Sequence, residues 1–173
     1  MPRSPHRAKT LKDLPGDREG AALVEFTVLV PLLLLLLAGF IEIGIAIQQY
    51  HLVQKSMRDA TRYLSRVPHD KSTLFDATSC NAAPTGQVLK AKNLAIYGNV
   101  AGTGTPKLTG WTYDDICVTG PTSRTVTFNT VSTDVYVVGM STAVPYTDLG
   151  FFGILGLTGF TLRGSHEQAF IGE

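Results

Sequence analysis

The chain has 173 residues, with 15 basic and 14 acidic side chains and a formal net charge of +1 at pH 7. A chain so close to neutral lacks the basic surface that binding to nucleic acid phosphates requires, so we expect no nucleic acid partner. Its two cysteines and four scattered histidines lack metal-ligand spacing, and no nucleotide-binding motif occurs, so we expect no metal and no cofactor.

The N-terminal quarter changes abruptly from polar to apolar. Residues 1–20 hold five basic side chains and three prolines without apolar periodicity, which predicts a disordered cytoplasmic leader. Residues 26–41 carry no charge and include six consecutive leucines at positions 32–37. A helix needs roughly 20 mainly apolar residues to cross a bilayer, so we predict one transmembrane helix with Glu25 and Glu42 near the two interfaces.

Glu25 stands at the head of the apolar run and is the most informative residue. A carboxylate costs about 2.5–3.5 kcal/mol at the centre of a bilayer and less near an interface, so its tolerance needs a chemical reason. Peptidase cleavage after Gly20 supplies one, because it creates an amino group on Ala21, one helical turn before Glu25. We expect this amine and carboxylate to pair, within one chain or between subunits.

An ordinary signal peptide is the alternative. The small residues of Gly44-Ile45-Ala46 have the spacing of such a cleavage site. The length of the apolar stretch and the position of Glu42 just before this site argue against it. The charges flanking the span give only weak support for a cytoplasmic N-terminus, because basic residues follow the span as well.

Beyond the span, apolar residues recur at alternating steps of four and three, which predicts an amphipathic continuation of the helix to residue 67. Pro68 ends this pattern. We expect the stripe to pack on the chain's own domain; a coiled-coil seam with another chain is the alternative. The stripe consists of Ala46, Tyr50, Val53, Met57, Ala60, Leu64 and Val67.

Residues 68–173 predict a small α+β domain on the exported side. Apolar spacing indicates a helix at 87–97, and Gly, Thr and Pro indicate a loop at 102–110. Alternating and β-branched runs predict three or four antiparallel strands, around 116–118, 124–129, 134–144 and 159–168. Turns are expected at Gly120-Pro121 and at residues 129–134. The fold class is therefore α+β, a long helix packed on a small antiparallel sheet.

Two features of this domain leave alternatives open. Cys80 and Cys117 both fall on the exported side, where an oxidising compartment favours a disulfide over two unpaired buried thiols. Residues 145–160 combine four glycines with large apolar side chains. This segment either folds back on the core or forms an exposed apolar patch for a partner or the membrane surface.

No catalytic constellation is evident. Ser165-His166-Glu167 is a run of sequence neighbours rather than a triad, and no nucleophile-elbow motif occurs. An envelope enzyme would need a site assembled from residues such as His166 or Asp114-Asp115, with their side chains converging in a cleft. We therefore expect a protein that is not an enzyme.

The basic leader, Gly20, Glu25, Phe26, the leucine-rich span and the amphipathic extension together resemble the class III signal sequences of type IV pilin-like proteins. More narrowly, the chain resembles TadE-like pseudopilins of the tight-adherence (Flp) pilus system. Phe26 stands where that motif usually has tyrosine, which keeps the ring and loses the hydroxyl. Residues 91–99 and 159–163 are also similar to stretches found in these proteins.

The resemblance implies a division into a leader (1–20) that prepilin peptidase removes, a helix (21–67) and a periplasmic domain (68–173). Gly20 would precede the cut, Ala21 would be the new N-terminus, and Glu25 and Phe26 would complete the motif. It implies a minor pseudopilin acting in assembly, in initiation or at the tip of the pilus. Its location would be the inner membrane, as a single-pass protein, or an extracellular pilus. Implied partners are a second pseudopilin, the Flp major pilin, the inner-membrane assembly platform and membrane lipid. An unprocessed, membrane-anchored periplasmic binding module is the alternative.

Overall fold

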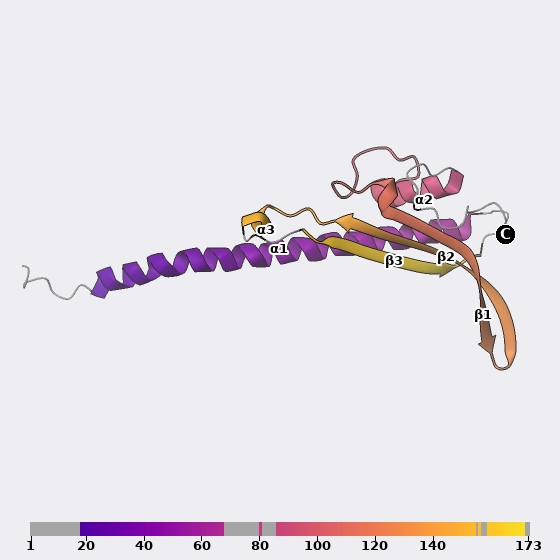
Figure 1. Cartoon of the computed structure of the whole chain (residues 1–173), viewed down its shortest axis with the longest axis horizontal. Helices are drawn as coiled ribbons and strands as arrows, with labels where there is room; N and C mark the ends of the chain where they lie inside the picture. Colours follow the sequence, from indigo (N-terminus) through magenta and orange to yellow (C-terminus); the bar gives the residue numbers. More distant parts are fainter. Residues whose placement is uncertain (1–17, 68–79, 81–85, 155, 157–158, 172–173) are drawn as a thin grey trace, which may run out of the picture. The chain divides into compact units, whose positions relative to one another are not determined.

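The structure, a computed structural model, describes residues 18–67, 80, 86–154, 156 and 159–171. It confirms the predicted α+β class, a long N-terminal helix with a three-stranded antiparallel sheet (Figure 1). The predicted leader lies outside the described residues except for its last three, which already belong to the helix. In chain order the elements are α1 (Arg18–Arg66), α2 (Gly86–Tyr97), the short 3-10 turn η2 (Tyr113–Asp115), β1 (Ile116–Phe128), β2 (Val131–Pro145), α3 (Phe151–Ile154) and β3 (Thr161–Ala169).

Helix α1 has 49 residues and is the one helix in the described part of the chain that is long and apolar enough to cross a membrane. The leucines at positions 32–37 are between 53% and 59% exposed. The later part of the helix behaves differently, since Val53, Met57, Ala60 and Leu64 are fully buried in the core of the domain. The amphipathic stripe therefore packs on the chain's own domain, as predicted.

The sheet has the strand order β1-β2-β3, with both pairings antiparallel. We predicted a turn at Gly120-Pro121 that would separate two strands, and this was wrong. Strand β1 continues through these residues and only shifts its register between Thr119 and Thr122. Gly120 permits this because its φ is +109° and a Cβ there would lie 2.5 Å from the Val137 carbonyl oxygen.

The turn between β1 and β2 is tighter than predicted. Only Asn129 and Thr130 form it, both with positive φ, so β2 already begins at Val131. Strand β3 pairs with β2 only from Val137 onward. The outer part of the β1–β2 hairpin therefore continues beyond the three-stranded region as two strands (Figure 1).

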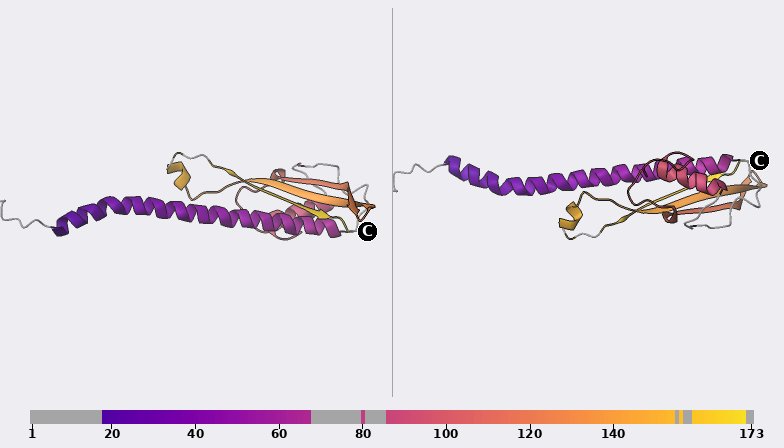
Figure 2. Two further views of the ribbon diagram at one scale, coloured as in Figure 1. Left: turned by 90° about the horizontal axis from the view of Figure 1, so that it is seen from below. Right: turned by 90° about the horizontal axis from the view of Figure 1, so that it is seen from above.

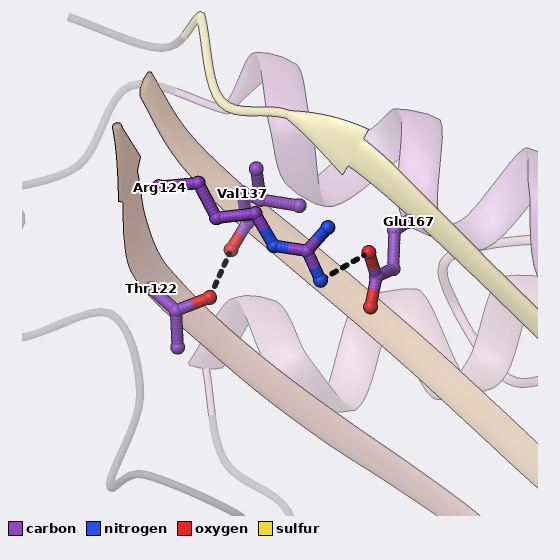
Figure 3. A network of polar contacts seen from close by, with 4 residues as sticks. All are labelled: Thr122, Arg124, Val137 and Glu167. Carbon is purple, nitrogen blue, oxygen red and sulfur yellow. Dashed lines mark hydrogen bonds and ion pairs between the residues drawn. The ribbon is translucent and has the colours of Figure 1, made fainter. Parts of the chain in front are cut away.

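The two faces of the sheet differ. On one face, apolar side chains of all three strands, including Val118, Met140 and Leu162, join the core together with α1 and α2. Figure 2 shows α2 and the later part of α1 side by side on this face. On the other face, Arg124 of β1 forms an ion pair of 2.9 Å with Glu167 of β3 (Figure 3). Both side chains are exposed, so this pair contributes about 0–1 kcal/mol, and the core rather than this face stabilises the sheet.

Two lysines tie the segment between α2 and β1 to the helices. Lys107 donates hydrogen bonds to the Ser56 hydroxyl (2.9 Å) and to the Leu94 carbonyl (3.2 Å). Lys92 is fully buried and donates to the Tyr113 carbonyl (2.9 Å). Burial lowers the pKa of both lysines, because the charged form loses its hydration. The sequence did not reveal these contacts, since lysine is ordinarily a surface residue.

Cys80 and Cys117 form a disulfide, as predicted. The bond closes a loop of 37 residues between the segment that follows α1 and strand β1. Replacing both cysteines by serine should lower the free energy of unfolding by up to about 4 kcal/mol, because the unfolded chain regains the entropy of that loop. Denaturant unfolding monitored by Trp111 fluorescence measures this change. The wild-type chain under reducing conditions is the control, and unfolding midpoints that agree between variant and oxidised wild type would contradict the prediction.

Gly164 allows β3 to approach α1 closely. A Cβ at this position would lie 2.8 Å from Cγ1 of Val53, a distance that real side chains do not adopt. Gly164→Ala should therefore destabilise the domain by about 1–3 kcal/mol, as other overpacked cores are destabilised. Gly159→Ala is the matched control, because nothing lies within 4 Å of its Cβ position. Adding Val53→Ala to Gly164→Ala should recover part of the loss in the same unfolding measurement, and equal stability of the two glycine variants would refute the clash.

Candidate functional site

The predicted processing residues lie on the first turns of α1. Gly20, Ala21, Glu25 and Phe26 are all helical and exposed. Glu25 follows Ala21 by four residues, which places both on one face of the helix. In the uncut chain the Ala21 nitrogen belongs to a peptide bond, so it carries no positive charge for Glu25. An ion pair between the Ala21 amino group and the Glu25 carboxylate would therefore require a cut after Gly20.

A second acidic residue, Glu42, occupies a very different environment. Its side chain is only 1% exposed. Oε1 accepts a hydrogen bond of 2.8 Å from the Tyr146 hydroxyl and one of 3.2 Å from the Leu149 backbone N–H. Oε2 has no hydrogen-bond partner among the described residues. The helix is thereby joined at this carboxyl group to the segment that follows β2.

Tyr146 is the centre of this contact. Its ring stacks on Phe160 with a centroid distance of 4.7 Å, and its backbone N–H donates to the Phe160 carbonyl (2.9 Å). Desolvation, followed by the hydrogen bond to Glu42 and the neighbouring carboxyl groups of Glu42 and Asp148, raises the pKa of Tyr146 to about 12. The phenol therefore keeps its proton at neutral pH and remains a donor to Glu42.

The contact also bears on the two alternatives for residues 145–160. The base of this segment folds back on the core, since Tyr146 is buried in it. Leu149 and Phe160 nevertheless remain exposed as large apolar side chains. Each alternative thus describes part of the segment. Glu42 was recognised from the sequence as an interfacial charge, but its partner was not, because no local pattern connects residues 104 positions apart.

An apolar groove lies next to this contact, between α1 and β3. Its volume is about 370 Å³, and all of its lining residues are aliphatic or aromatic. Ile43 and Ile47, the two isoleucines of this lining on α1, are exposed. The full lining is Ile43, Ala46, Ile47, Tyr50, Phe160 and Leu162.

A larger, open pocket of about 640 Å³ includes Asp114, Asp115 and Arg163 in its lining. The carboxylate of Asp115 already accepts hydrogen bonds from the backbone N–H (2.7 Å) and hydroxyl (2.8 Å) of Thr112, which fix the turn before β1. His166 does not line this pocket. Within the described residues, no cluster of His, Cys, Asp and Glu is suited to a metal ion. The two aspartates therefore line one open pocket together with Arg163.

Removing the Tyr146 hydroxyl tests its role towards Glu42. Tyr146→Phe keeps the stacked ring but leaves buried Oε1 with a single donor, so the free energy of unfolding should fall by about 1–3 kcal/mol. Tyr50→Phe is the matched control, because the Tyr50 side chain lines the neighbouring groove with Phe160 and is half-exposed. Trp111 fluorescence during denaturant unfolding measures both variants, and equal losses would contradict the prediction.

The same variant has a signature at alkaline pH. The folded-state pKa of Tyr146 is raised from 10.0 to about 12, so its contribution to stability is complete below pH 10 and is lost as the pH rises towards 12. Tyr146→Phe should therefore lose less stability than the wild type over this interval. Parallel losses in the two proteins would show that Tyr146 is not shielded from water.

Comparison with known proteins gives a match within helix α1. The family model described as TadE-like protein matches residues 20–62, which include Gly20, Glu25 and most of α1. No curated protein and no solved structure matches the chain. The match supports the resemblance inferred from the sequence motifs: over residues 20–62 the chain is similar to TadE-like proteins.

Proposed function

We propose that this chain is a minor pseudopilin, a structural factor in assembly or initiation of the Tad pilus or at its tip. The observation that carries the proposal is the position of Glu25, five residues after Gly20 at the head of an exposed apolar helix. The family match supports it, because the matched segment begins at Gly20. The remaining domain would be an assembly element rather than an enzyme.

In this proposal, prepilin peptidase cuts after Gly20 at the cytoplasmic face of the inner membrane. The new amino group of Ala21 then neutralises Glu25, in the same chain or in a neighbouring subunit. The exposed leucines of α1 contact lipid before assembly and other apolar helices afterwards. Partners are a second pseudopilin, the Flp major pilin and the inner-membrane assembly platform.

The disulfide supports a periplasmic location for the folded domain. Disulfides persist in oxidising compartments such as the periplasm and are rare in the cytoplasm. Cys80 and Cys117 both follow the apolar helix, so the domain that they stabilise would lie on the exported side. The leader would then remain in the cytoplasm, where the peptidase acts.

The mature N-terminus decides between processing and its alternatives. Mass spectrometry of the native protein should find Ala21 as the first residue in cells with prepilin peptidase, and the complete leader in cells without it. A chain that still begins at Met1 in both strains would favour an unprocessed membrane-anchored binding module. A chain that begins at Ile47 would instead indicate ordinary signal peptide cleavage, and both results would overturn the proposal.

Replacement of Glu25 separates cleavage from assembly. Glu25→Ala should still be cut after Gly20, because the scissile bond is unchanged, but piliation should be strongly reduced, because the Ala21 amine loses its partner in an apolar setting. Glu25→Asp is the conservative control and should retain part of the piliation. Normal piliation of the alanine variant, counted by electron microscopy, would refute the pairing.

A further inference from the structure

We propose that the folded domain has a second lipid-contacting surface, formed by the apolar groove between α1 and β3 together with Leu149. This surface would lie in the leaflet on the domain's side of the bilayer, with acyl chains over the groove. The inference goes beyond the proposed pilus function and rests only on its membrane-spanning helix.

The length of the charge-free segment is the first reason. Residues 26–41 cover only about 24 Å at 1.5 Å per residue, whereas the hydrocarbon core of a bilayer is about 30 Å thick. The hydrocarbon must therefore extend past one of the two bounding glutamates. Extension to residue 47 gives about 33 Å, which is sufficient.

The different environments of the two glutamates indicate past which of them the hydrocarbon extends. Glu25 is exposed, so lipid tails around it would meet a charged or polar group directly. Glu42 is shielded within the domain by Tyr146 and Leu149. The surface that lipid meets beyond it consists of Ile43 and Ile47, which are 56% and 52% exposed. The hydrocarbon boundary can therefore pass Glu42 without contacting its carboxyl group.

The groove continues this surface away from the helix. Ile43 and Ile47 form one side of it, and Phe160 and Leu162 of the sheet region form the other. The side chain of Leu149 is 59% exposed, and the backbone N–H of the same residue donates the hydrogen bond to Glu42. Tyr50 and Phe160 add half-exposed aromatic rings, which are enriched where hydrocarbon meets headgroups.

The charges beyond the groove favour lipid over a protein partner. No charged side chain lines the groove. The next charged residues on α1 are Lys55 and Arg58, both exposed, and Lys55 lies about 12 Å past Ile47 along the helix. Basic side chains at that height match the anionic headgroups of a bilayer. The order along the helix, apolar groove first and basic residues next, is that of a membrane interface.

Spin labels on the full-length chain test this placement. The disulfide-intact protein carries Ile47→Cys or Leu149→Cys and is reconstituted in vesicles of phosphatidylcholine and phosphatidylglycerol. Labels at both positions should collide several-fold more with oxygen than with a water-soluble nickel chelate. Val126→Cys, on the exposed outer part of the hairpin, is the matched control and should show the opposite order.

Two outcomes would overturn the inference. Labels at positions 47 and 149 as accessible to nickel as the label at 126 would place the surface in water. Dipolar broadening that disappears on dilution with unlabelled protein would show that a second copy covers the groove instead. Neither result bears on the mature N-terminus, so a failure here is distinguishable from a failure of the pseudopilin proposal.

The Glu42 contact gives a second measurement. In the Leu149→Cys background, Tyr146→Phe should shift the label towards nickel accessibility, because Glu42 then recruits water to replace the lost donor. Glu42→Gln keeps an acceptor for the Tyr146 hydroxyl and should leave the label in lipid. Trp111 fluorescence confirms that each variant is folded. If Tyr146→Phe does not move the label, the shielding of Glu42 does not position this surface, and the inference fails.

Discussion

Helix α1 has two parts with different surroundings, and the buried side chain of Glu42 lies where they meet. Upstream of it, α1 exposes apolar side chains that water would not tolerate, and downstream the same helix supplies the core of the folded domain. A carboxyl group at that boundary is costly unless it is hydrogen-bonded. Tyr146 and the Leu149 N–H both donate to Oε1 of this group, so one of its two oxygens is hydrogen-bonded where the two parts of α1 meet.

The rest of the domain follows from docking on this helix. Four buried residues of α1, Val53, Met57, Ala60 and Leu64, fill the space against one face of the sheet. The absence of a side chain at Gly164 lets β3 come into contact with Val53. The core therefore lies on one side of the three-stranded sheet, and the other face carries exposed polar side chains such as Arg124 and Glu167. The disulfide and the hydrogen bonds of Lys92 and Lys107 restrain the segments that connect the helices to the sheet.

Local patterns predicted what depends on local physics. The spacing of apolar residues in α1 predicted its buried stripe, and the β-branched run of β2 predicted the central strand. Both predictions succeeded because the period of buried positions depends on residues close together in the sequence. The prediction of a turn at Gly120-Pro121 was wrong. This dipeptide is typical of turns, and only the pairing of β1 with β2 makes it a shift of register within a strand. Of the candidate sites, the Gly20–Glu25 spacing and the cysteine pair were visible. The Glu42–Tyr146 contact was not, because its partners meet only after the chain has folded.

Under the proposed function, Glu25 and Glu42 of α1 differ in where their carboxyl groups find partners. Glu42 finds its donors within its own domain, so moving the subunit from bilayer to filament leaves that contact unchanged. For Glu25 no such donor is found among the described residues, and its proposed partner would arise only when the peptide bond after Gly20 is cut. The electrostatic change in the proposed maturation would therefore be confined to the N-terminal end of the helix, away from the contact of Glu42 with its own domain. Under the proposed function, processing and assembly would then leave the hydrogen bonds of Glu42 in the folded part unchanged.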